Sequence, residues 1–329
     1  MPTTQPSTTE FDKREDLGLM YAEFDLAMNR LGFIGSRLLP VISRADQSGK
    51  FPRVPIEQLL QNLDASRAPG SPYKRSTREW SNDDYATEEY GLEAPLDDRT
   101  LKRYDDVIDA ELMEGEVLEN ALLQIYEKQV ADLLFNATTF AGRTSAITNE
   151  WDDQANADPI GDVNTAINAI RLASGVKPNA VVMNDQVFRN VIRCDQVTNL
   201  VKYQGFMDAR PGQISKAALA AVLNVDEVIV SEGIYNTKSP GETAVNADIW
   251  DDEYVLVARV ATSSNMMERC IGRTFMWGEE GATAGGDMAV IAETYYEDSR
   301  RGNTIRRRTD WGLKMLQPEC GYLLSNATT

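Results

Sequence analysis

The sequence predicts an α+β protein in which a compact core carries long extensions. Three features support this prediction. Residues Asp109–Asn136 have the spacing of one long amphipathic helix, and residues Trp151–Val230 alternate between short helical and short strand patterns. Residues Phe51–Asp98 are polar and hold too few large aliphatic side chains to form a core of their own. Alternating short units beside one long helix, followed by a run of strands, are typical of mixed folds.

Composition narrows the function classes. The chain has 329 residues, 42% hydrophobic and 26% charged, as expected for a globular protein with one large domain or two modest ones. Its 33 Lys and Arg against 51 Asp and Glu give a net charge of −18, which disfavours tight binding of nucleic acid. No apolar run is long enough to cross a membrane, and the N-terminus MPTTQPSTTEFDKRED lacks the apolar stretch of a secretory signal. We therefore expect a cytosolic protein without membrane contact.

The residue types needed for common active sites are missing. There is no histidine, which removes Ser-His-Asp and Cys-His catalysis and the usual zinc and iron sites. The three cysteines, Cys194, Cys270 and Cys320, are widely spaced and are expected to be small buried hydrophobes. No P-loop pattern occurs, and GATAGG at Gly281 lacks the spacing of a dinucleotide loop. We predict no catalytic residue, no cofactor and no metal.

The N-terminal half is expected to be mostly extended. Residues Met1–Asp16 are rich in Thr, Ser and Pro and predict a flexible arm, and Leu17–Val41 predict a short helix with an extended lead-in. In Phe51–Asp98 the stretches SPYKRSTREW and YATEEYGLEA alternate at period 2, which predicts strands of a hairpin. Arms of about 20 residues would reach on the order of 60 Å. Because an isolated hairpin is marginal in water, we expect this arm to rest on another subunit.

The long helix has one apolar stripe. Its members follow at i+4 and its first turns are acidic, as the helix dipole prefers, although Gly115 could interrupt the start. The stripe is Leu118, Leu122, Tyr126, Val130 and Leu134. Such a stripe needs a sheet or other helices along its length, so we assign it to the core.

Helix caps delimit the compact region. Asp158 precedes Pro159 at a predicted helix start, and Gly175 ends that helix. Asn184 and Ser215 can cap two more helices, and each cap region lies near a short apolar strand. The predicted strands of this region and of the C-terminal part are Ala180–Met183, Val228–Val230, Tyr254–Val260, Arg273–Trp277, Met288–Tyr296 and, after a Gly302-Asn303 turn, Thr304–Leu316.

This order of segments resembles the major capsid proteins of tailed bacteriophages, which have the Hong Kong 97-type fold. The stretch RAPGSPYKRSTREWSNDDYATEEYGLEAPLDD resembles the extended loop of that family (the E-loop) and its return into a spine helix. DVNTAINAIRLASGVKPNAVVMNDQVFRNVI resembles a segment of the axial domain, and WGLKMLQPECGYLL resembles the close of the peripheral domain. The resemblance covers roughly residues 20 to 325 and rests on the order of segments, since no single motif is diagnostic.

The resemblance implies a division of the chain and a function. The implied regions are an N-terminal arm and lead-in (1–50), the E-loop (51–98), the spine helix of the peripheral domain (99–150), the axial domain (151–270) and returning strands that belong mostly to the peripheral domain (271–329). The implied function is a structural subunit that self-assembles as hexamers and pentamers into the icosahedral shell of a virion around double-stranded DNA. A separate scaffolding protein, a portal and a decoration protein are the implied partners, with assembly in the host cytoplasm.

Charge patterning suggests a contact between subunits. An acidic arm and a basic C-terminal hairpin are separated by some 200 residues, and we hypothesise that they meet between neighbouring copies. The alternative is that both are solvated faces paired locally. The acidic residues are Glu79, Asp83, Asp84, Glu88, Glu89, Glu93, Asp97 and Asp98, and the basic ones are Arg300, Arg301, Arg306, Arg307 and Arg308. Some relatives form an isopeptide crosslink from an E-loop lysine, for which Lys74 is the sole candidate here; an ordinary exposed lysine is the alternative.

Two other functions stay open at this stage. An encapsulin, a cellular nanocompartment with the same fold, differs in its contents, and a phage tail or decoration protein is a weaker option. A carboxylate-dependent enzyme is the rival from a different class, with Asp152/Asp153 or Asp251/Asp252 as candidate acids. Adjacent residues on a strand point to opposite faces, which argues against such pairs.

Overall fold

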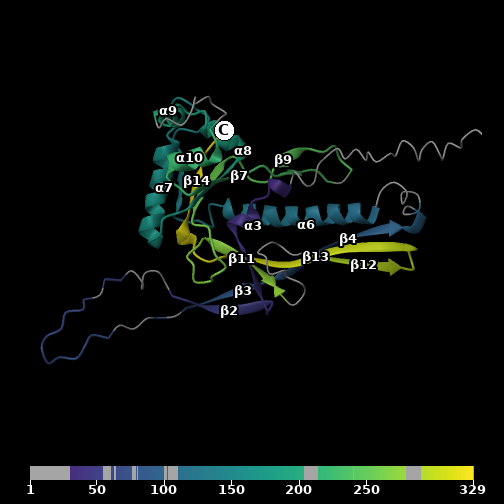
Figure 1. The fold of residues 1–329 in the computed structure, drawn as a ribbon, viewed down its shortest axis with the longest axis horizontal. Coiled ribbons are helices and arrows are strands. Elements are labelled where there is room, and N and C mark those ends of the chain that lie inside the picture. The colour runs from purple at the N-terminus through teal and green to yellow at the C-terminus, as the bar shows by residue number, and fades with distance from the viewer. Residues whose placement is uncertain are drawn as a thin grey trace, which may run out of the picture.

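A computed structural model describes residues 30–54, 61–62, 64–75, 79, 81–99, 102, 110–203, 214–239, 241–278 and 290–328. Figure 1 shows a compact part with α7–α10 around a small sheet, a long helix α6 that lies alongside a second sheet, and a hairpin that projects from the body. The arm expected at 1–16 lies outside the described residues, as do residues 17–29 of the segment 17–41 in which a short helix and an extended lead-in are expected. The described part of that segment contains the short helix Gly35–Leu38. The mixed helix-and-strand architecture is the predicted α+β class.

The long helix is present as α6, Ala110–Leu134. It runs without interruption through Gly115, so the predicted break there is absent. A Cβ at this position would lie 2.5 Å from the Arg307 guanidinium, so glycine leaves room for the Arg307 side chain where the sheet packs on the helix. Leu122, Tyr126, Val130 and Leu134 of the predicted stripe are buried.

The compact part is built on a five-stranded sheet. The strand order is β5-β14-β10-β6-β7, with β6 and β7 parallel and β10 antiparallel to both of its neighbours. The strands are β5 (Thr144–Ala146), β6 (Ala180–Asn184), β7 (Glu227–Ser231), β10 (Tyr254–Ala258) and β14 (Gly321–Ser325). The helices around it are α7 (Pro159–Ser174), α8 (Asp185–Val191), α9 (Asp195–Tyr203) and α10 (Lys216–Leu223).

The predicted caps start and stop these helices. Asp158 Oδ1 accepts from the N–H of Gly161 at 2.9 Å, with Pro159 as the first residue of α7. Asn184 and Ser215 accept from backbone N–H groups in the first turns of α8 and α10. Gly175 ends α7 at φ 72°, a left-handed conformation that glycine adopts without strain. These boundaries therefore follow from local sequence.

Each face of the sheet has its own apolar core, because successive strand side chains point to opposite sides. Val181 and Met183 of β6 pack with α7–α10, whereas Ala180 and Val182 pack with α6 and Trp250. The five residues of β6 are all buried, as expected for a strand covered on both faces.

The second sheet lies under α6. Its order is β1-β11-β13-β12, and β4 pairs with β13 as well. The strands are β1 (Val41–Arg44), β4 (Glu88–Asp97), β11 (Gly272–Trp277), β12 (Ile291–Glu297) and the long β13 (Gly302–Met315). The remaining elements are α3 (Gly35–Leu38), η2 (Pro318–Cys320) and the pairs β2–β3 (Ser48–Arg53, Ser81–Ala86) and β8–β9 (Ile234–Asn236, Asn246–Asp248).

The structure differs from two sequence predictions. The expected hairpin arms of about 20 residues are paired only between β2 and β3, since β4 runs along β13 instead. Tyr90, Leu92, Ala94 and Leu96 alternate with exposed residues, and this alternation gives β4 a buried face for the sheet.

The C-terminal turn also lies elsewhere. Gly302 belongs to β13 and pairs with Asp97, and a Cβ there would lie 2.1 Å from the Leu96 carbonyl oxygen. Gly302 is therefore required by close strand pairing. The turn uses residues 298–301, with Arg301 at φ 51° as its left-handed residue.

A buried carboxylate joins α6 to the rest of the fold. Glu127, 1% exposed, accepts from Ile34 N at 2.8 Å, Gly35 N at 2.7 Å and the Trp250 indole N–H at 2.7 Å. A Cβ at Gly35 would lie 2.6 Å from the carboxylate, so glycine permits this approach. The three donors come from α3, its preceding residue and the loop before β10, and one side chain thus connects three segments far apart in sequence. Burial raises the pKa of Glu127, and the three N–H donors oppose that rise.

We predict that Glu127→Gln lowers the free energy of unfolding by about 1–3 kcal/mol at pH 5, because an amide NH₂ would face one of the buried N–H donors. Denaturant unfolding followed by tryptophan fluorescence measures this. Glu116→Gln, which changes an exposed glutamate of the same helix, is the matched control and should change stability little.

The difference in stability between wild type and Glu127→Gln is predicted to depend on pH. Because the native pKa of Glu127 is raised, its contribution is fully present below the unfolded-state pKa of about 4.3 and is lost as the pH rises through the native pKa. The stability gap between wild type and Glu127→Gln should therefore narrow from pH 5 to pH 8. A gap that widens over this range contradicts the assignment.

Candidate assembly surfaces

The β2–β3 hairpin is anchored at its base and leaves the body beyond it. Tyr85 stacks on Phe275 of β11 at 4.6 Å between ring centroids, and Phe51 lies 6.2 Å from the same ring. Figure 1 shows the described residues that follow this base extending well away from both sheets. A segment that lies so far outside its own core has surface to offer to another molecule.

The acidic residues of β3 find a basic partner that the sequence hypothesis did not name. Lys314 Nζ lies 2.7 Å from Asp83 and 3.7 Å from Asp84, and Arg53 lies 4.0 Å from Asp83. Lys314 lies near the end of β13, six residues after Arg308, the last of the three consecutive arginines. The signal that could have identified it is the alternation of Thr304–Leu316, which places every second residue on one face of a strand.

Acidic and basic strands meet within one chain on the sheet of β4, β13 and β12. Arg306 is opposite both Glu93 and Glu293 in register, and its guanidinium lies 2.5 Å and 3.3 Å from their carboxylates. Arg308 lies 2.9 Å from Glu293 and 3.6 Å from Glu89. The result is a ladder of alternating charge across three strands.

The titration of these groups follows from the contacts. Donation from Arg308 is the main cause that lowers the pKa of Glu293, with Arg306 adding to it. The hydrogen bond with Glu93 raises the pKa of Arg306. Glu293 and Arg306 therefore stay charged near neutral pH. Exposed ion pairs of this kind nevertheless contribute little to the free energy of unfolding.

Arg307 faces the other way. Its Nε donates to the Gly115 carbonyl oxygen of α6 at 3.3 Å, on the face where Trp311 donates to Gln129 at 2.8 Å. The three consecutive arginines are thus not one basic patch, since strand alternation places the middle one against the helix.

The other predicted site residues are spread over the surface. Glu88 accepts from the Tyr90 hydroxyl at 3.2 Å, Arg300 lies 3.6 Å from Glu297, and Arg301 lies in the turn. Glu79 is exposed, and Lys74 forms an ion pair with Asp64. Local pairing accounts for Glu89, Glu93, Arg306 and Arg308, and contact of these residues between neighbouring copies stays a prediction.

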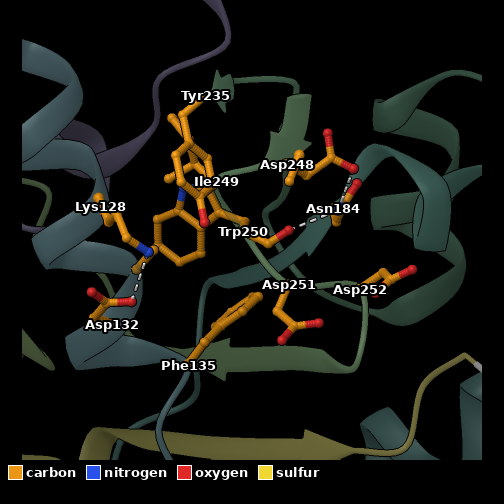
Figure 2. Close-up of a pocket in the computed structure, with 12 residues that line it drawn as sticks. Lys128, Asp132, Phe135, Asn184, Tyr235, Asp248, Ile249, Trp250, Asp251 and Asp252 are labelled. Atoms are coloured by element: carbon orange, nitrogen blue, oxygen red, sulfur yellow. Dashed lines mark hydrogen bonds and ion pairs between the residues drawn. The ribbon is translucent and has the colours of Figure 1, made fainter. Parts of the chain in front are cut away.

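An acidic pocket of about 360 Å³ lies between α6 and the loop before β10 (Figure 2). Its floor includes Phe135 and Trp250, whose rings are edge-to-face at 4.8 Å between centroids. Its charged residues are Lys128, Asp132, Asp248, Asp251 and Asp252. Burial, followed by the influence of Asp251 and Asp248, raises the pKa of Asp252.

The argument against Asp251 and Asp252 as paired acids assumed that they lie on a strand. The two residues precede β10 and do not lie on a strand, so the argument from strand alternation does not apply to them, and both line the pocket. In the described part of the chain, no group of three or more His, Cys, Asp or Glu is placed to hold a metal ion. No helix among the described residues is long and apolar enough to span a membrane.

Comparison with known proteins places this geometry in a structural class. No family model matches the sequence. The chain is 27% identical over 231 residues, 68% of its length, to a protein of Burkholderia phage BcepMu named major capsid protein, of which it covers 70%.

Solved structures match over nearly the whole chain. A phage-related protein from Bordetella bronchiseptica matches with a TM-score of 0.63 at 21% identity, covering 92% of this chain and 96% of that one. The capsid structure of cyanophage P-SCSP1u matches with a TM-score of 0.59 at 14% identity, covering 89% and 87%. The fold is therefore that of phage capsid subunits, the Hong Kong 97 type that the order of segments predicts.

The same fold also occurs outside phages. The encapsulin of Synechococcus elongatus matches with a TM-score of 0.52 at 12% identity, covering 96% of this chain and 94% of that one. This likeness concerns the fold alone, and the fold by itself does not distinguish a phage capsid subunit from an encapsulin.

We predict that the Glu93–Arg306 pair has a coupling free energy of about 0.2–1 kcal/mol in a double-mutant cycle of E93A and R306A. The coupling should fall in 1 M NaCl, where the Debye length is about 3 Å. E93A with R307A is the matched control, with no coupling expected because Arg307 is on the opposite face. A coupling as large for Arg307 as for Arg306 would show that the faces are assigned wrongly.

Proposed function

We propose that this chain is the major capsid protein of a tailed phage, a structural subunit that assembles into a closed icosahedral head. The fold, found over most of the chain, carries the proposal, together with the sequence likeness to the BcepMu protein. A projecting hairpin and a long helix beside a sheet offer extended contact surfaces, and a shell is made from such repeated contacts. Hexamers and pentamers of identical copies are the expected building units.

The proposal includes a division of labour along the chain. Residues 51–98 act as the extended loop with its return strand β4, 99–150 as the spine, 151–270 as the axial part and 271–329 as returning strands, the last of which, β14, joins the axial sheet. The head encloses double-stranded DNA without sequence-specific contacts, in keeping with a net charge of −18. A scaffolding protein, a portal and a decoration protein are the proposed partners, assembly takes place in the host cytoplasm, the virion is the final location, and no enzymatic activity is expected.

Negative-stain electron microscopy tests this function. The protein is purified after expression alone and together with the genes that neighbour its own. Closed polyhedral particles, or rings of five and six, are the expected result. A uniform monomer or dimer under all of these conditions would count against a shell subunit.

The contents of the particles distinguish a phage head from an encapsulin, whose fold this chain shares. Particles from infected or induced cells are treated with nuclease and then opened. Protected double-stranded DNA supports the phage head, whereas a packaged protein cargo with no DNA supports a nanocompartment.

The hairpin gives a further prediction. Replacing residues 54–80 with a two-residue Asn-Gly turn should leave the melting temperature of the subunit within a few degrees, since the hairpin base at Phe51, Tyr85 and Phe275 is kept. The same variant should form no closed particles in the microscope. Closed particles of normal size from the shortened chain would contradict a role for the hairpin in assembly.

A further inference from the structure

The loop Thr262–Glu268, between β10 and β11, is closed by one carboxylate. Glu268 accepts from the backbone N–H and the hydroxyl of both Thr262 and Ser263, at 2.7 to 2.9 Å. Partial burial alone would raise the pKa of Glu268, but these four donors lower it to about 2. The loop is therefore closed at all pH values near neutrality. A short loop whose ends are tied together by its own side chains has the form of an Ω-loop.

Two arginines, of which Arg273 is fully buried and Arg259 partly buried, contact the closed loop at its base. Arg273, whose side chain is 0% exposed, donates to the Asn265 carbonyl oxygen at 2.8 Å and lies 3.6 Å from Glu268. Arg259 lies 3.9 Å from the same carboxylate. Asn265 Oδ1 accepts from the Met267 N–H at 3.0 Å, which orients the tip. The conformation of the loop is thus held by polar contacts at its base and at its turn.

An apolar side chain stands at the tip of this rigid loop. The Met267 side chain is 86% exposed. Holding a large apolar residue in water in a single backbone conformation lowers the entropy cost of binding it later. Methionine also adapts to irregular surfaces. The arrangement is that of a preformed contact residue.

The charge of the loop indicates what it contacts. Ala261–Met267 contains no charged residue, in a chain with a net charge of −18. Glu268, the first charge after it, is turned toward Arg259 and Arg273. Two copies of an acidic protein repel each other over most of their surfaces, and a neutral apolar tip is a place where they can approach without that repulsion.

We propose that the Thr262–Glu268 loop is a self-association contact in which Met267 inserts against a second copy of this chain. The contact rests on the proposed shell function and adds one defined point to it. The proposed contact joins the loop of one copy to a different surface of the next copy and is therefore heterologous, the kind that closes into rings.

Charge introduction at the tip tests the contact. Met267→Glu should raise the subunit concentration needed for assembly by about tenfold or more, because a buried apolar side chain is replaced by a charge facing an acidic neighbour. Met267→Leu should assemble as wild type does. Leu172→Glu, at an apolar position that is 74% exposed on α7, is the matched control and should also assemble normally. Light scattering gives the assembly threshold, and circular dichroism checks that each variant is folded.

Crosslinking identifies the surface that is contacted. Benzoylphenylalanine at position 267 is incorporated into a mixture of ¹⁵N-labelled and unlabelled subunits, which are assembled, irradiated and digested. Crosslinked peptides of mixed isotope content are expected, because they join two copies. Crosslinks only within one copy, or normal assembly of Met267→Glu, would overturn the contact.

The two proposals fail in different ways. If wild-type protein forms particles and Met267→Glu forms them at the same concentration, the contact is wrong and the shell function stands. If wild-type protein forms no particles, the shell function itself is wrong.

Discussion

The position of α6 depends on one buried carboxylate. Glu127 accepts three N–H groups at 2.7 to 2.8 Å, from the segment around α3 and from Trp250. A charge in the interior is costly unless its hydrogen-bonding capacity is used, so the three donors must be brought to it together. This requirement brings the start of α3, the middle of α6 and the loop before β10 together at Glu127. The apolar stripe of α6 provides the contact area between the helix and the rest of the fold. The hydrogen bonds of Glu127 fix the position of the helix along that contact.

Because α6 is held in this way, the second sheet can extend beyond the compact core. Trp311 of β13 packs edge-to-face on Tyr126 at 5.7 Å and stacks with Tyr90 of β4 at 3.9 Å. Farther along, the apolar contacts give way to the charge ladder of Arg306, Arg308 and their glutamates. The sheet is thus packed through aromatic side chains near the core and is polar on its outer face.

Charge sets a second constraint on any assembly of this chain. Its acidity opposes the approach of identical copies, and the ion pairs of the outer face are mostly satisfied internally. Contacts between copies must then use either long segments that leave the body, such as the β2–β3 hairpin, or small neutral surfaces. The closed loop that presents Met267 is a surface of the second kind. Many weak contacts of these kinds allow a shell to correct errors while it forms.

The sequence by itself determined the features that depend on neighbours along the chain. The long helix, the caps Asp158, Asn184 and Ser215, and the buried strands Ala180–Asn184 and Glu227–Ser231 were all predictable, because periodicity and capping are local. The order of these segments also predicted the capsid-type fold. Tertiary structure alone decided that β4 leaves the hairpin for β13, that Gly302 serves strand pairing, and that Arg307 turns away from its two neighbours. It also decided which residues meet Glu127 and Glu268. Strand partners and buried polar contacts join residues far apart in sequence, and a strand pattern specifies that one face is buried but not which strand or side chain will cover it.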